Sequence, residues 1–364
     1  MQQPHRPLVL LVGGAYIDLV LHVPEFPAED DKLRATKVDR RTGGNAFNTA
    51  CVLAQISPPA AAVAIVSPAG TGGDDLLGPT ADRLGFTYLP LTHPNHLHPT
   101  AYIIASAATK SRTIVNHATL PALDDAGLRT VLASSEHLRL DHAAWVHFEG
   151  RPNVDDIRTM IDSVRDAAPS TVRISVELER PNRPGLDSLI PLADMVVVSR
   201  EYAVAHGRRP LLPESHDHAH LDPSVVDDTS SWPLEARLSL DWARSWLLPK
   251  LCPGAVAFMP MGSLGAVAVQ RTRTDSGQTR LMSAYEPALA VDVVDTIGAG
   301  DAFNAGAIAA LLHVMTPDAT TSATAVDNQR LRLARVLRMA VGVAGRKVAR
   351  DGFDGLAVNL DDLM

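Results

Sequence analysis

Residues 295–303 read Asp-Thr-Ile-Gly-Ala-Gly-Asp-Ala-Phe, and no other stretch of the chain is as informative. Three small residues, Gly298, Ala299 and Gly300, lead directly into Asp301, and the alanine-rich apolar segment 302–315 is typical of a helix. Glycine allows backbone N–H groups to approach an anion closely. Because the N–H groups at a helix start have no acceptors within the helix, they favour a bound phosphate. The stretch therefore predicts a phosphate-binding turn with a carboxylate beside it.

The carboxylate of Asp301 has two interpretations. As an ordinary residue of a strand-to-helix turn, it stabilises the helix start through the helix dipole alone. The same dipole favours the ionised form, and an ionised Asp301 next to a bound phosphate can orient and deprotonate a hydroxyl group. The second interpretation predicts phosphoryl transfer to an alcohol.

The bulk properties agree with a soluble enzyme. The 364 residues are enough for one large domain or two ordinary ones, each with a sizeable core. The formal net charge of −8 argues against a nucleic-acid or acidic-membrane partner. Only two cysteines occur, Cys51 and Cys252, which favours a reducing compartment over a disulfide framework. No segment has the pattern of a signal peptide or the length of a membrane span, so a cytoplasmic location is expected.

Short β-rich runs alternate with helical stretches along the chain. The runs expected as buried parallel strands cover residues 8–12, 62–66, 145–148, 172–177, 195–198 and 255–259. Helical stretches between and after them include residues 46–55, 154–168 and 331–348. This alternation predicts an α/β fold, a mainly parallel sheet covered by helices on both faces.

Three segments interrupt the alternation within what we expect to be a single domain, residues 1–364. Segments 16–42 and 100–118 are extended and alternate in polarity, and they predict a small separate sheet over the carboxyl edge, where open α/β sheets bind ligands. Segment 209–240 is acidic and rich in Pro and His, and it predicts a surface insertion. Its histidines, at positions 216, 218 and 220, would face one side of a strand and ligate a metal there, but their Pro and Asp neighbours favour a loop.

Two signatures carry a family resemblance. The stretch 295–303 resembles the C-terminal signature of the ribokinase-like (PfkB) sugar kinases, and the hexapeptide Gly-Gly-Asn-Ala-Phe-Asn, residues 43–48, resembles their second signature. Further segments resemble the ketohexokinase (fructokinase) branch, lie in the same order and extend over most of the chain. They begin at Phe26 (Phe-Pro-Ala-Glu-Asp-Asp), Ser111 (Ser-Arg-Thr-Ile), Trp145 (Trp-Val-His-Phe-Glu-Gly-Arg), Ile174 (Ile-Ser-Val-Glu-Leu-Glu-Arg-Pro), Asp292 (Asp-Val-Val-Asp-Thr-Ile-Gly-Ala-Gly-Asp), Val343 (Val-Ala-Gly-Arg-Lys) and Gly352 (Gly-Phe-Asp-Gly).

The resemblance implies a three-layer α/β/α fold with a β-sheet lid, which in the family often forms a homodimer contact. It also implies ATP-dependent phosphorylation of a sugar hydroxyl, above all of a ketose such as fructose. Asp301 would be the catalytic base and residues 298–300 the anion hole. The alternatives are another kinase of this fold, acting on ribose, 2-keto-3-deoxygluconate or adenosine, and a sugar-binding protein without catalysis. The low aromatic content of 4% disfavours a nucleoside pocket.

The sugar contacts implied by the resemblance are polar residues, because a polyol is recognised through oriented hydrogen bonds. They are Asp18, Asp30, Gly44, Asn45 and Asn48, with Arg112 on the lid closing over the sugar or the transferred phosphate. Other interpretations stay open: helix capping for Asn45, a solvated position for Asn48 and a surface position for Arg112. The choice of Asp30 over its neighbour Asp31 rests on the register set by residues 26–27.

The nucleotide is not held by a Walker A motif or by a Gly-x-Gly-x-x-Gly turn after the first strand, since neither is present. Segment 261–265 instead resembles the family's glycine turn beside ATP, making Gly262 and Gly265 candidates, although a plain tight turn explains them equally well. Mg²⁺ is expected with ATP. In relatives the Asp295-Thr296 step can bind a monovalent cation such as K⁺, and turn hydrogen bonding is the alternative.

The metal ligands remain unknown from the sequence. Many relatives carry an Asn-x-x-Glu motif tied to magnesium, and here that turn reads Ser-Arg-Glu-Tyr, residues 199–202, as in ketohexokinase-like sequences. Four charged residues follow predicted strands near the expected phosphate, and at least one should order a magnesium-bound water: Glu149, Arg151, Glu177 and Glu179. Among these, Glu177 and Glu149 are the candidates for the metal site.

Overall fold

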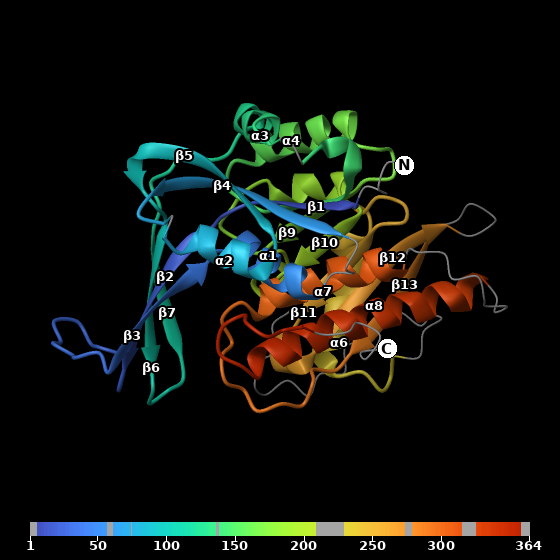
Figure 1. Ribbon diagram of the computed structural model, residues 1–364. Helices are drawn as coiled ribbons and strands as arrows, with labels where there is room; N and C mark the ends of the chain where they lie inside the picture. Colours follow the sequence, from blue (N-terminus) through green and yellow to red (C-terminus); the bar gives the residue numbers. More distant parts are fainter. Residues whose placement is uncertain are drawn as a thin grey trace.

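A computed structural model of the chain describes residues 6–56, 61–73, 75–135, 138–208, 229–273, 279–314 and 325–357. In these residues a large sheet lies between two layers of helices, and a smaller sheet projects from the carboxyl edge of the large one (Figure 1). The predicted three-layer α/β/α architecture with a β-sheet lid is therefore confirmed.

The large sheet has nine strands in the order β13-β12-β11-β10-β9-β8-β1-β4-β5. Seven strands are parallel: β1 (Leu8–Val12), β4 (Ala62–Thr71), β5 (Thr87–Leu97), β8 (Ala143–Glu149), β9 (Arg173–Leu178), β10 (Met195–Val198) and β11 (Val256–Pro260). The antiparallel strands β12 (Ala266–Arg273) and β13 (Thr279–Glu286) complete one edge. Strand β1 has β4 on one side and β8 on the other, so the chain changes direction across the sheet there, and ligands bind beyond such a point.

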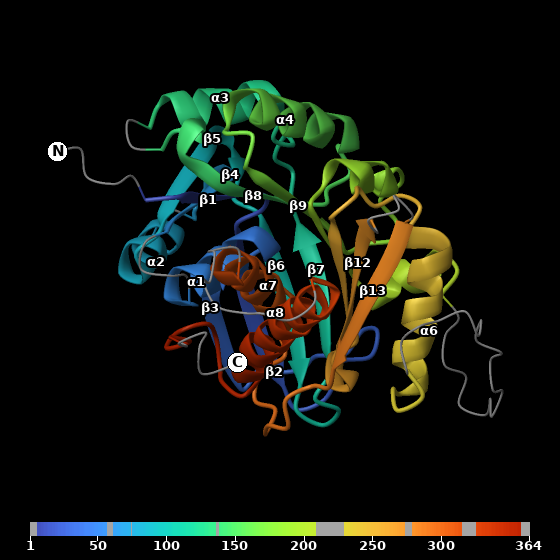
Figure 2. The same ribbon diagram turned by 90° about the vertical axis from the view of Figure 1, so that its right-hand side faces the viewer.

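Helices cover both faces of this sheet (Figure 2). One face carries α1 (Asn45–Ile56), α2 (Leu77–Leu84), α7 (Ala299–Val314) and α8 (Ala325–Val348). The other carries α3 (Asp125–Ala133), α4 (Val154–Ala167), α5 (Arg200–Ala205) and α6 (Leu234–Trp242). The strand residues alternate between the two cores, as Val9 and Leu10 do, which is why these strands read as continuous apolar runs.

The predicted core strands and helices all occur, with bounds that differ by a few residues at most ends. Helix α8 begins earlier than expected, at Ala325 rather than residue 331. Of the predicted insertion 209–240, residues 209–228 lie outside the described residues, and so do His216, His218 and His220. Its end forms α6, which buries Leu240 and Trp242 against the sheet.

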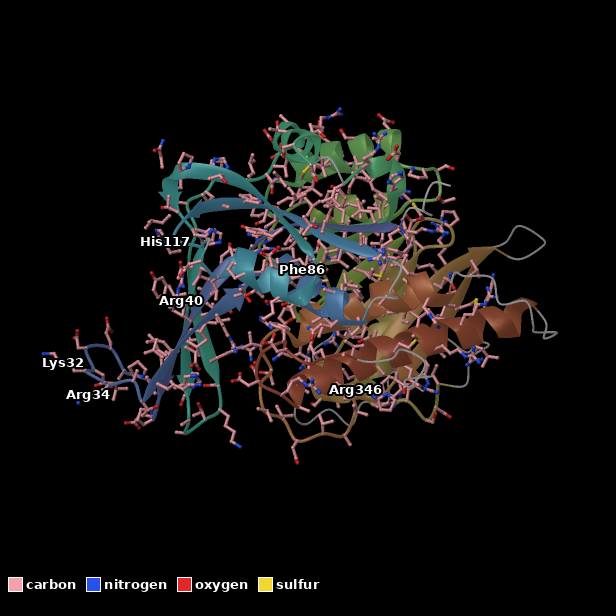
Figure 3. The ribbon with its side chains drawn as sticks, viewed as in Figure 1. Lys32, Arg34, Arg40, Phe86, His117 and Arg346 are labelled. Carbon is pink, nitrogen blue, oxygen red and sulfur yellow. The ribbon has the colours of Figure 1, made fainter. Side chains whose placement is uncertain are left out.

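The lid is a four-stranded sheet in the order β3-β2-β6-β7. Its strands are β2 (Tyr16–Val23), β3 (Lys37–Gly43), β6 (Thr100–Ser106) and β7 (Arg112–His117). Strands β6 and β7 form an antiparallel hairpin, and the loop between β2 and β3 extends past the lid, where Figure 3 labels Lys32 and Arg34. Val38 and Val115 are each 58% exposed, so the lid presents apolar side chains to its surroundings.

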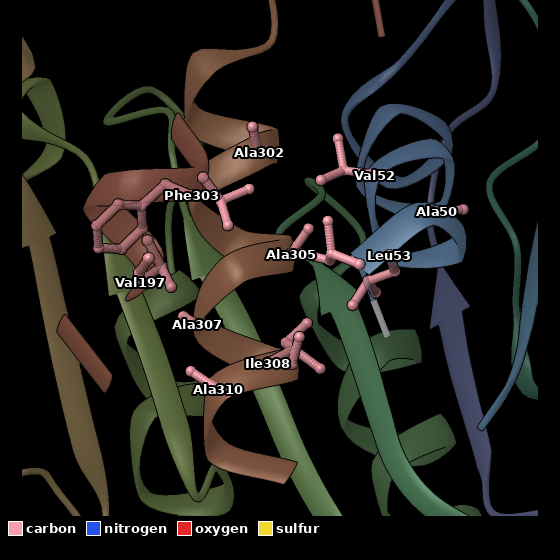
Figure 4. Close-up of a cluster of buried hydrophobic side chains, with 14 of the residues drawn as sticks. Ala50, Val52, Leu53, Val197, Ala302, Phe303, Ala305, Ala307, Ile308 and Ala310 are labelled. Atoms are coloured by element: carbon pink, nitrogen blue, oxygen red, sulfur yellow. The ribbon is translucent and has the colours of Figure 1, made fainter. Parts of the chain in front are cut away.

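Helix α7 carries the decisive stretch into the core. Figure 4 shows it beside α1 and over the sheet, with Phe303 beside Val197 and Ala305 facing Leu53. Its many small side chains allow close packing, and a Cβ at Gly306 would lie 2.9 Å from the Cα atom of Ala340 on α8. No helix among the described residues has both the length and the apolar character that crossing a membrane requires.

We expect Gly306→Ala to lower the free energy of unfolding by about 1–3 kcal/mol, because the added methyl group meets backbone atoms that cannot move away. The control is Gly78→Ala on α2, where the new Cβ has no atom within 4 Å. That change should stabilise the protein by about 0.5–1 kcal/mol through helix propensity and a less flexible unfolded chain. Urea unfolding of both variants measures the difference, and equal effects would contradict this account of the α7–α8 contact.

Candidate active site

Most of the residues singled out from the sequence line one pocket of about 290 Å³ at the carboxyl edge of the large sheet, beneath the lid. They come from the lid strands, the start of α1, the ends of β8 and β9, and the start of α7. These residues are Asp18, Gly44, Asn45, Asn48, Arg112, Glu149, Arg151, Glu177, Glu179, Gly298, Ala299, Gly300 and Asp301. The fold thus brings both family-like signatures to the same place.

Three of the residues predicted to bind the sugar or the nucleotide do not line this pocket. Asp30 is exposed, in the loop that extends past the lid, and has a φ of 67°. Gly262 and Gly265 form the turn between β11 and β12. A Cβ at Gly265 would lie 2.0 Å from the carbonyl oxygen of Glu286, so the backbone alone explains this glycine.

The turn that leads into α7 depends on Gly298. Its φ is 75°, a left-handed conformation that favours glycine, and a Cβ there would lie 2.2 Å from the ring of Phe353. The Gly298 carbonyl accepts the first helical hydrogen bond, from the N–H of Ala302 at 2.9 Å. A Cβ at Gly300, in contrast, would point into open space. The turn therefore places a helix start at the pocket, where N–H groups have no acceptors within the helix, although the N–H of Ala299 donates to the carbonyl oxygen of Thr296 at 3.4 Å.

Asn48 holds the carboxylate of Asp301. Its Nδ2 donates to Asp301 Oδ2 at 2.7 Å, and Thr49 Oγ1 donates to the Asp301 carbonyl oxygen at 3.3 Å. The interpretation of Asn48 as solvated is wrong, since its side chain is buried. Its Oδ1 is also buried and has no hydrogen-bond partner among the described residues. That oxygen is available to accept a hydrogen bond from a ligand hydroxyl.

Three glutamates stand next to Asp301 at the ends of β8 and β9. Asn45 Nδ2 donates to Glu177 Oε2 at 3.3 Å and to Glu179 Oε2 at 3.2 Å. Glu149 is compensated by Arg151, whose Nε lies 2.9 Å from Oε1, and by the N–H of Gly14 at 2.8 Å. Asn45 therefore bridges two carboxylates in the structure and does not act as a simple helix cap.

Burial and like charges raise the pKa values in this cluster. Burial, together with the charges of Glu179 and Glu149, raises the pKa of Glu177 to about 8, against the hydrogen bond from Asn45. Burial, and then the charge of Glu177, hold the pKa of Asp301 well above its usual range. The expectation that the helix dipole favours the ionised form of Asp301 is thus outweighed by desolvation and by the neighbouring carboxylates.

The gathered carboxylates suit a positively charged ligand, because a cation would lower the free energy of their ionised forms. Among the described residues, no group of three or more His, Cys, Asp or Glu side chains is arranged to hold a metal ion directly. Mg²⁺ commonly keeps several waters and binds through one or two carboxylates together with phosphate oxygens. Glu177 and Glu149 fit that mode of binding, and they cannot form a closed metal cage.

Asp18 occupies the lid side of the pocket. It lies within β2, the first lid strand, rather than at the end of a core strand. Burial raises its pKa to about 6, with the charge of Arg41 opposing and that of Asp295 adding to the shift. A Cβ at Gly43 would lie 2.1 Å from the Asp18 carboxylate, and Gly44 has a φ of 91°. Gly43 therefore leaves room for the Asp18 carboxylate, whereas at Gly44 a Cβ would lie 2.4 Å from the carbonyl oxygen of Gly14.

The sequence did not single out the side chains that fix the Asp295-Thr296 step. Lys347 is fully buried, and its Nζ donates to Asp295 Oδ2 at 2.7 Å and to the Asp295 carbonyl at 3.1 Å. Asp295 Oδ1 accepts from the N–H of Ile297 at 2.9 Å. Although burial raises the pKa of Asp295, these hydrogen bonds hold it below its usual value. From the sequence, a lysine at the end of a long helix is expected to be solvated. The resemblance of segment 343–347 to the family was the only sign in the sequence that Lys347 lies near the site.

The turn that replaces the family's Asn-x-x-Glu motif has a structural role. Ser199 caps α5, its Oγ accepting from the N–H of Tyr202 at 3.0 Å. Arg200 Nε lies 3.0 Å from Oε1 of Glu235 on α6, and the buried Arg208 contacts the same oxygen at 2.9 Å. These contacts connect α5 and Arg208 to α6. Ser199 is the member of this turn that lines the pocket.

Comparisons with known proteins agree with this geometry. A model of the pfkB family carbohydrate kinases matches residues 248–354. Ketohexokinase from Mus musculus is 27% identical over 354 residues, which cover 96% of this chain and 98% of that protein. Ribokinase from Giardia lamblia has a similar structure, with a TM-score of 0.70 at 19% identity, covering 98% of this chain and 97% of that one. A ribokinase from Cryptococcus neoformans in complex with ADP has a TM-score of 0.62 at 14% identity, covering 98% of both chains.

We expect Gly298→Ala and Gly300→Ala to fail in different ways. Gly298→Ala should destabilise the fold, by about 1–3 kcal/mol or more, because its φ is left-handed and the ring of Phe353 is in the way. Gly300→Ala should leave the unfolding midpoint nearly unchanged while weakening anion binding, since its methyl group enters the pocket. Thermal unfolding and equilibrium binding of ADP by both variants distinguish these outcomes. Equal stability of the two variants would refute the distinction.

The raised pKa of Glu177, about 8 in the folded chain against an ordinary 4.5, makes stability depend on pH. Between these values the folded state binds more protons than the unfolded state, so stability falls as pH rises through this window. Glu177→Gln should therefore raise the melting temperature at pH 8.5 by on the order of 2 °C relative to the unmodified protein. The gain should shrink at pH 5. Glu201→Gln, at an exposed position of α5, serves as the control and should show no such pH dependence.

Proposed function

Because the chain belongs to the pfkB family of carbohydrate kinases, we propose that it transfers the γ-phosphoryl group of ATP to a hydroxyl group of a ketose sugar such as fructose. The contact that carries the proposal is the 2.7 Å hydrogen bond by which Asn48 holds Asp301 beside the turn 298–300. A carboxylate oriented next to an anion-binding helix start is the arrangement that phosphoryl transfer to an alcohol requires.

In the proposed mechanism Asp301 holds the acceptor hydroxyl and takes its proton, while backbone N–H groups of residues 298–300 stabilise the moving phosphoryl group. The raised pKa of Asp301 makes it a better base once it is ionised. Since the transition state for such transfer is loose, orientation and electrostatic stabilisation contribute more than proton removal. Asn48 keeps Oδ2 of Asp301 in place, and Oδ1, which has no hydrogen bond within the part of the chain that the structure describes, would face the hydroxyl.

Lid and core residues on both sides of the acceptor space favour a neutral polyol as the acceptor. Asp18 and Asp301 place two carboxylates around the acceptor space, which disfavours a sugar acid through charge repulsion. Asn48 Oδ1 offers a buried acceptor without a partner, which suits a sugar hydroxyl. The similarity to mouse ketohexokinase favours a ketose over the other sugars. Gly44 and Asn45 complete the proposed sugar site.

On the phosphate side, Arg112 Nη1 donates to the hydroxyl oxygen of Thr296, immediately before the turn. This contact supports a role for Arg112 at the transferred phosphate rather than at the sugar. Mg²⁺ brought by ATP would be held near Glu177 and Glu149 through its waters, and would neutralise phosphate charge there. Gly262, where an added Cβ would have no atom within 4 Å, would lie beside the nucleotide.

We leave K⁺ out of the proposal. Both carboxylate oxygens of Asp295 and its carbonyl oxygen already accept hydrogen bonds, from Ile297 and from Lys347. A monovalent cation bound to the oxygens of Asp295 would have to displace these hydrogen bonds. The structure thus favours turn hydrogen bonding over cation binding at Asp295.

A homodimer formed through the lid would account for two features. The lid exposes apolar side chains, including Val38, Tyr102 and Val115, which a second copy could cover. Asp30 lies outside the pocket of its own chain, so it contacts a sugar only if its loop reaches the pocket of another copy. Both observations support a dimer in which the two lids pack together.

The proposal is tested by ADP release with Mg-ATP against fructose, ribose, tagatose, 2-keto-3-deoxygluconate and adenosine. We expect turnover with fructose, and we expect Asp301→Asn to lower it by about 10²–10⁴-fold, because proton transfer and orientation are both lost. Asp82→Asn, which changes an exposed carboxylate on α2, should leave turnover unchanged.

Three outcomes contradict parts of the proposal. Turnover with another member of the panel and not with fructose contradicts the substrate assignment but leaves the proposed mechanism in place. Near-normal turnover of a folded Asp301→Asn variant contradicts the assignment of Asp301 as the catalytic base. ATP binding without turnover on any acceptor favours a sugar-binding protein instead of an enzyme for this substrate class.

A further inference from the structure

Two arginines connect the lid to the residues that precede the anion-hole turn. They come from β3 and β7, which are the two edge strands of the lid sheet. Arg41 Nη1 lies 3.4 Å from Oδ2 of Asp295, and Arg112 donates to the hydroxyl oxygen of Thr296. Both edges of the lid therefore contact the same dipeptide, one step before Ile297 and the turn itself.

Asp295 is held from the core side by several hydrogen bonds. Besides the contacts of Lys347 and Ile297 described above, its N–H and that of Val294 donate to the carbonyl oxygen of Val348, at 3.1 and 2.7 Å. Its side chain is only 12% exposed. Because Asp295 accepts from the N–H of Ile297, a displacement of its carboxylate would move the turn 298–300.

Arg41 also stands next to the acceptor side of the pocket. In the antiparallel pairing of β2 and β3 it lies directly opposite Asp18, and its charge acts on that carboxylate as well as on Asp295. Its side chain is 23% exposed, and its second carboxylate partner, Asp351, is on the surface at 3.4 Å. One guanidinium thus lies between the proposed sugar-binding carboxylate and the carboxylate that sets the phosphate turn.

We propose that Arg41 is a positioning residue that couples the lid over the acceptor to the anion-hole turn through Asp295. When the lid settles on an acceptor, Arg41 comes to rest against Asp295 and Asp18 together, and this arrangement favours the turn geometry that binds the phosphoryl group. By linkage, a nucleotide at the turn favours the same lid position. The inference rests on the proposed function, in which the lid covers the acceptor and the turn binds the phosphoryl group.

The chain provides a matched control in Arg40, labelled in Figure 3. It is the preceding residue of the same edge strand, so its side chain points to the opposite face. It is also paired with an acid, donating to Asp75 at 2.6 and 2.8 Å and to the Gly72 carbonyl at 3.0 Å. Arg40→Ala removes the same charge from the same strand without touching the Asp295 contact.

The test measures binding of the non-hydrolysable ATP analogue AMP-PNP, with Mg²⁺, in the absence and presence of saturating fructose. We expect fructose to tighten AMP-PNP binding by about fivefold or more in the unmodified protein and in Arg40→Ala. The quantity compared is the ratio of the AMP-PNP dissociation constant without fructose to that with fructose. In Arg41→Ala this ratio should fall to about one, and Arg41→Lys should restore part of the increase. A residue that only supports the fold would change both affinities without changing their ratio.

The proposal would be overturned if Arg41→Ala kept the same ratio of dissociation constants as the unmodified protein. It would also be overturned if Arg40→Ala lowered the ratio as much as Arg41→Ala does. If fructose neither becomes phosphorylated nor changes AMP-PNP binding in the unmodified protein, the acceptor assignment has failed, and hydrogen exchange then decides the coupling without an acceptor. AMP-PNP should slow amide exchange in residues 37–43 of the unmodified protein and of Arg40→Ala, but not of Arg41→Ala. Equal slowing in all three proteins, or none in the unmodified protein, also overturns the coupling.

Discussion

The hydrogen bond between Asn48 and Asp301 is the contact on which the site depends. It joins the starts of α1 and α7, and each helix can begin there only because a glycine with positive φ, Gly44 or Gly298, turns the chain into it. The small side chains of α7 then let this helix approach α1 and the sheet closely. The proposed sugar contacts, the carboxylates and the anion hole lie in one pocket because the starts of α1 and α7 both lie there.

The carboxyl edge of the sheet gathers negative charge that is only partly compensated. Glu149 has Arg151 and a backbone N–H, whereas among the described residues the side chains of Glu177 and Asp301 have only amide partners. Burying carboxylates in this way costs folding free energy, and such strain is typical of sites that bind a charged ligand. The free energy lost in the protein alone is regained when positive charge and phosphate enter, so the site favours binding over stability.

The sequence predicted the layers, the strands and the lid because apolar runs, helical periodicity and glycine turns are local features that appear in the chain itself. It also identified the residues of both signatures, where backbone requirements restrict the choice of side chain. It could not predict that Asp301 would have a raised pKa, because that depends on Glu177 and Glu149 from distant strands. The burial of Lys347 against Asp295 likewise arises from tertiary packing, and the place of Asp30 outside the pocket depends on the path of a surface loop.

The ring of Phe353 against Gly298 and the hydrogen bond from Lys347 to Asp295 also affect how the protein is made. Asn48 leaves the ribosome long before the partners of α1 are made, since Asp301 comes 253 residues later in the chain. Lys347 and Phe353 follow later still. At a synthesis rate of roughly 5–20 residues per second, the apolar face of α1 waits on the order of 10–50 s for α7 and α8 to cover it. The nascent chain therefore cannot form its pocket before the C-terminal helices emerge, and during that interval α1 is a surface for a chaperone to protect.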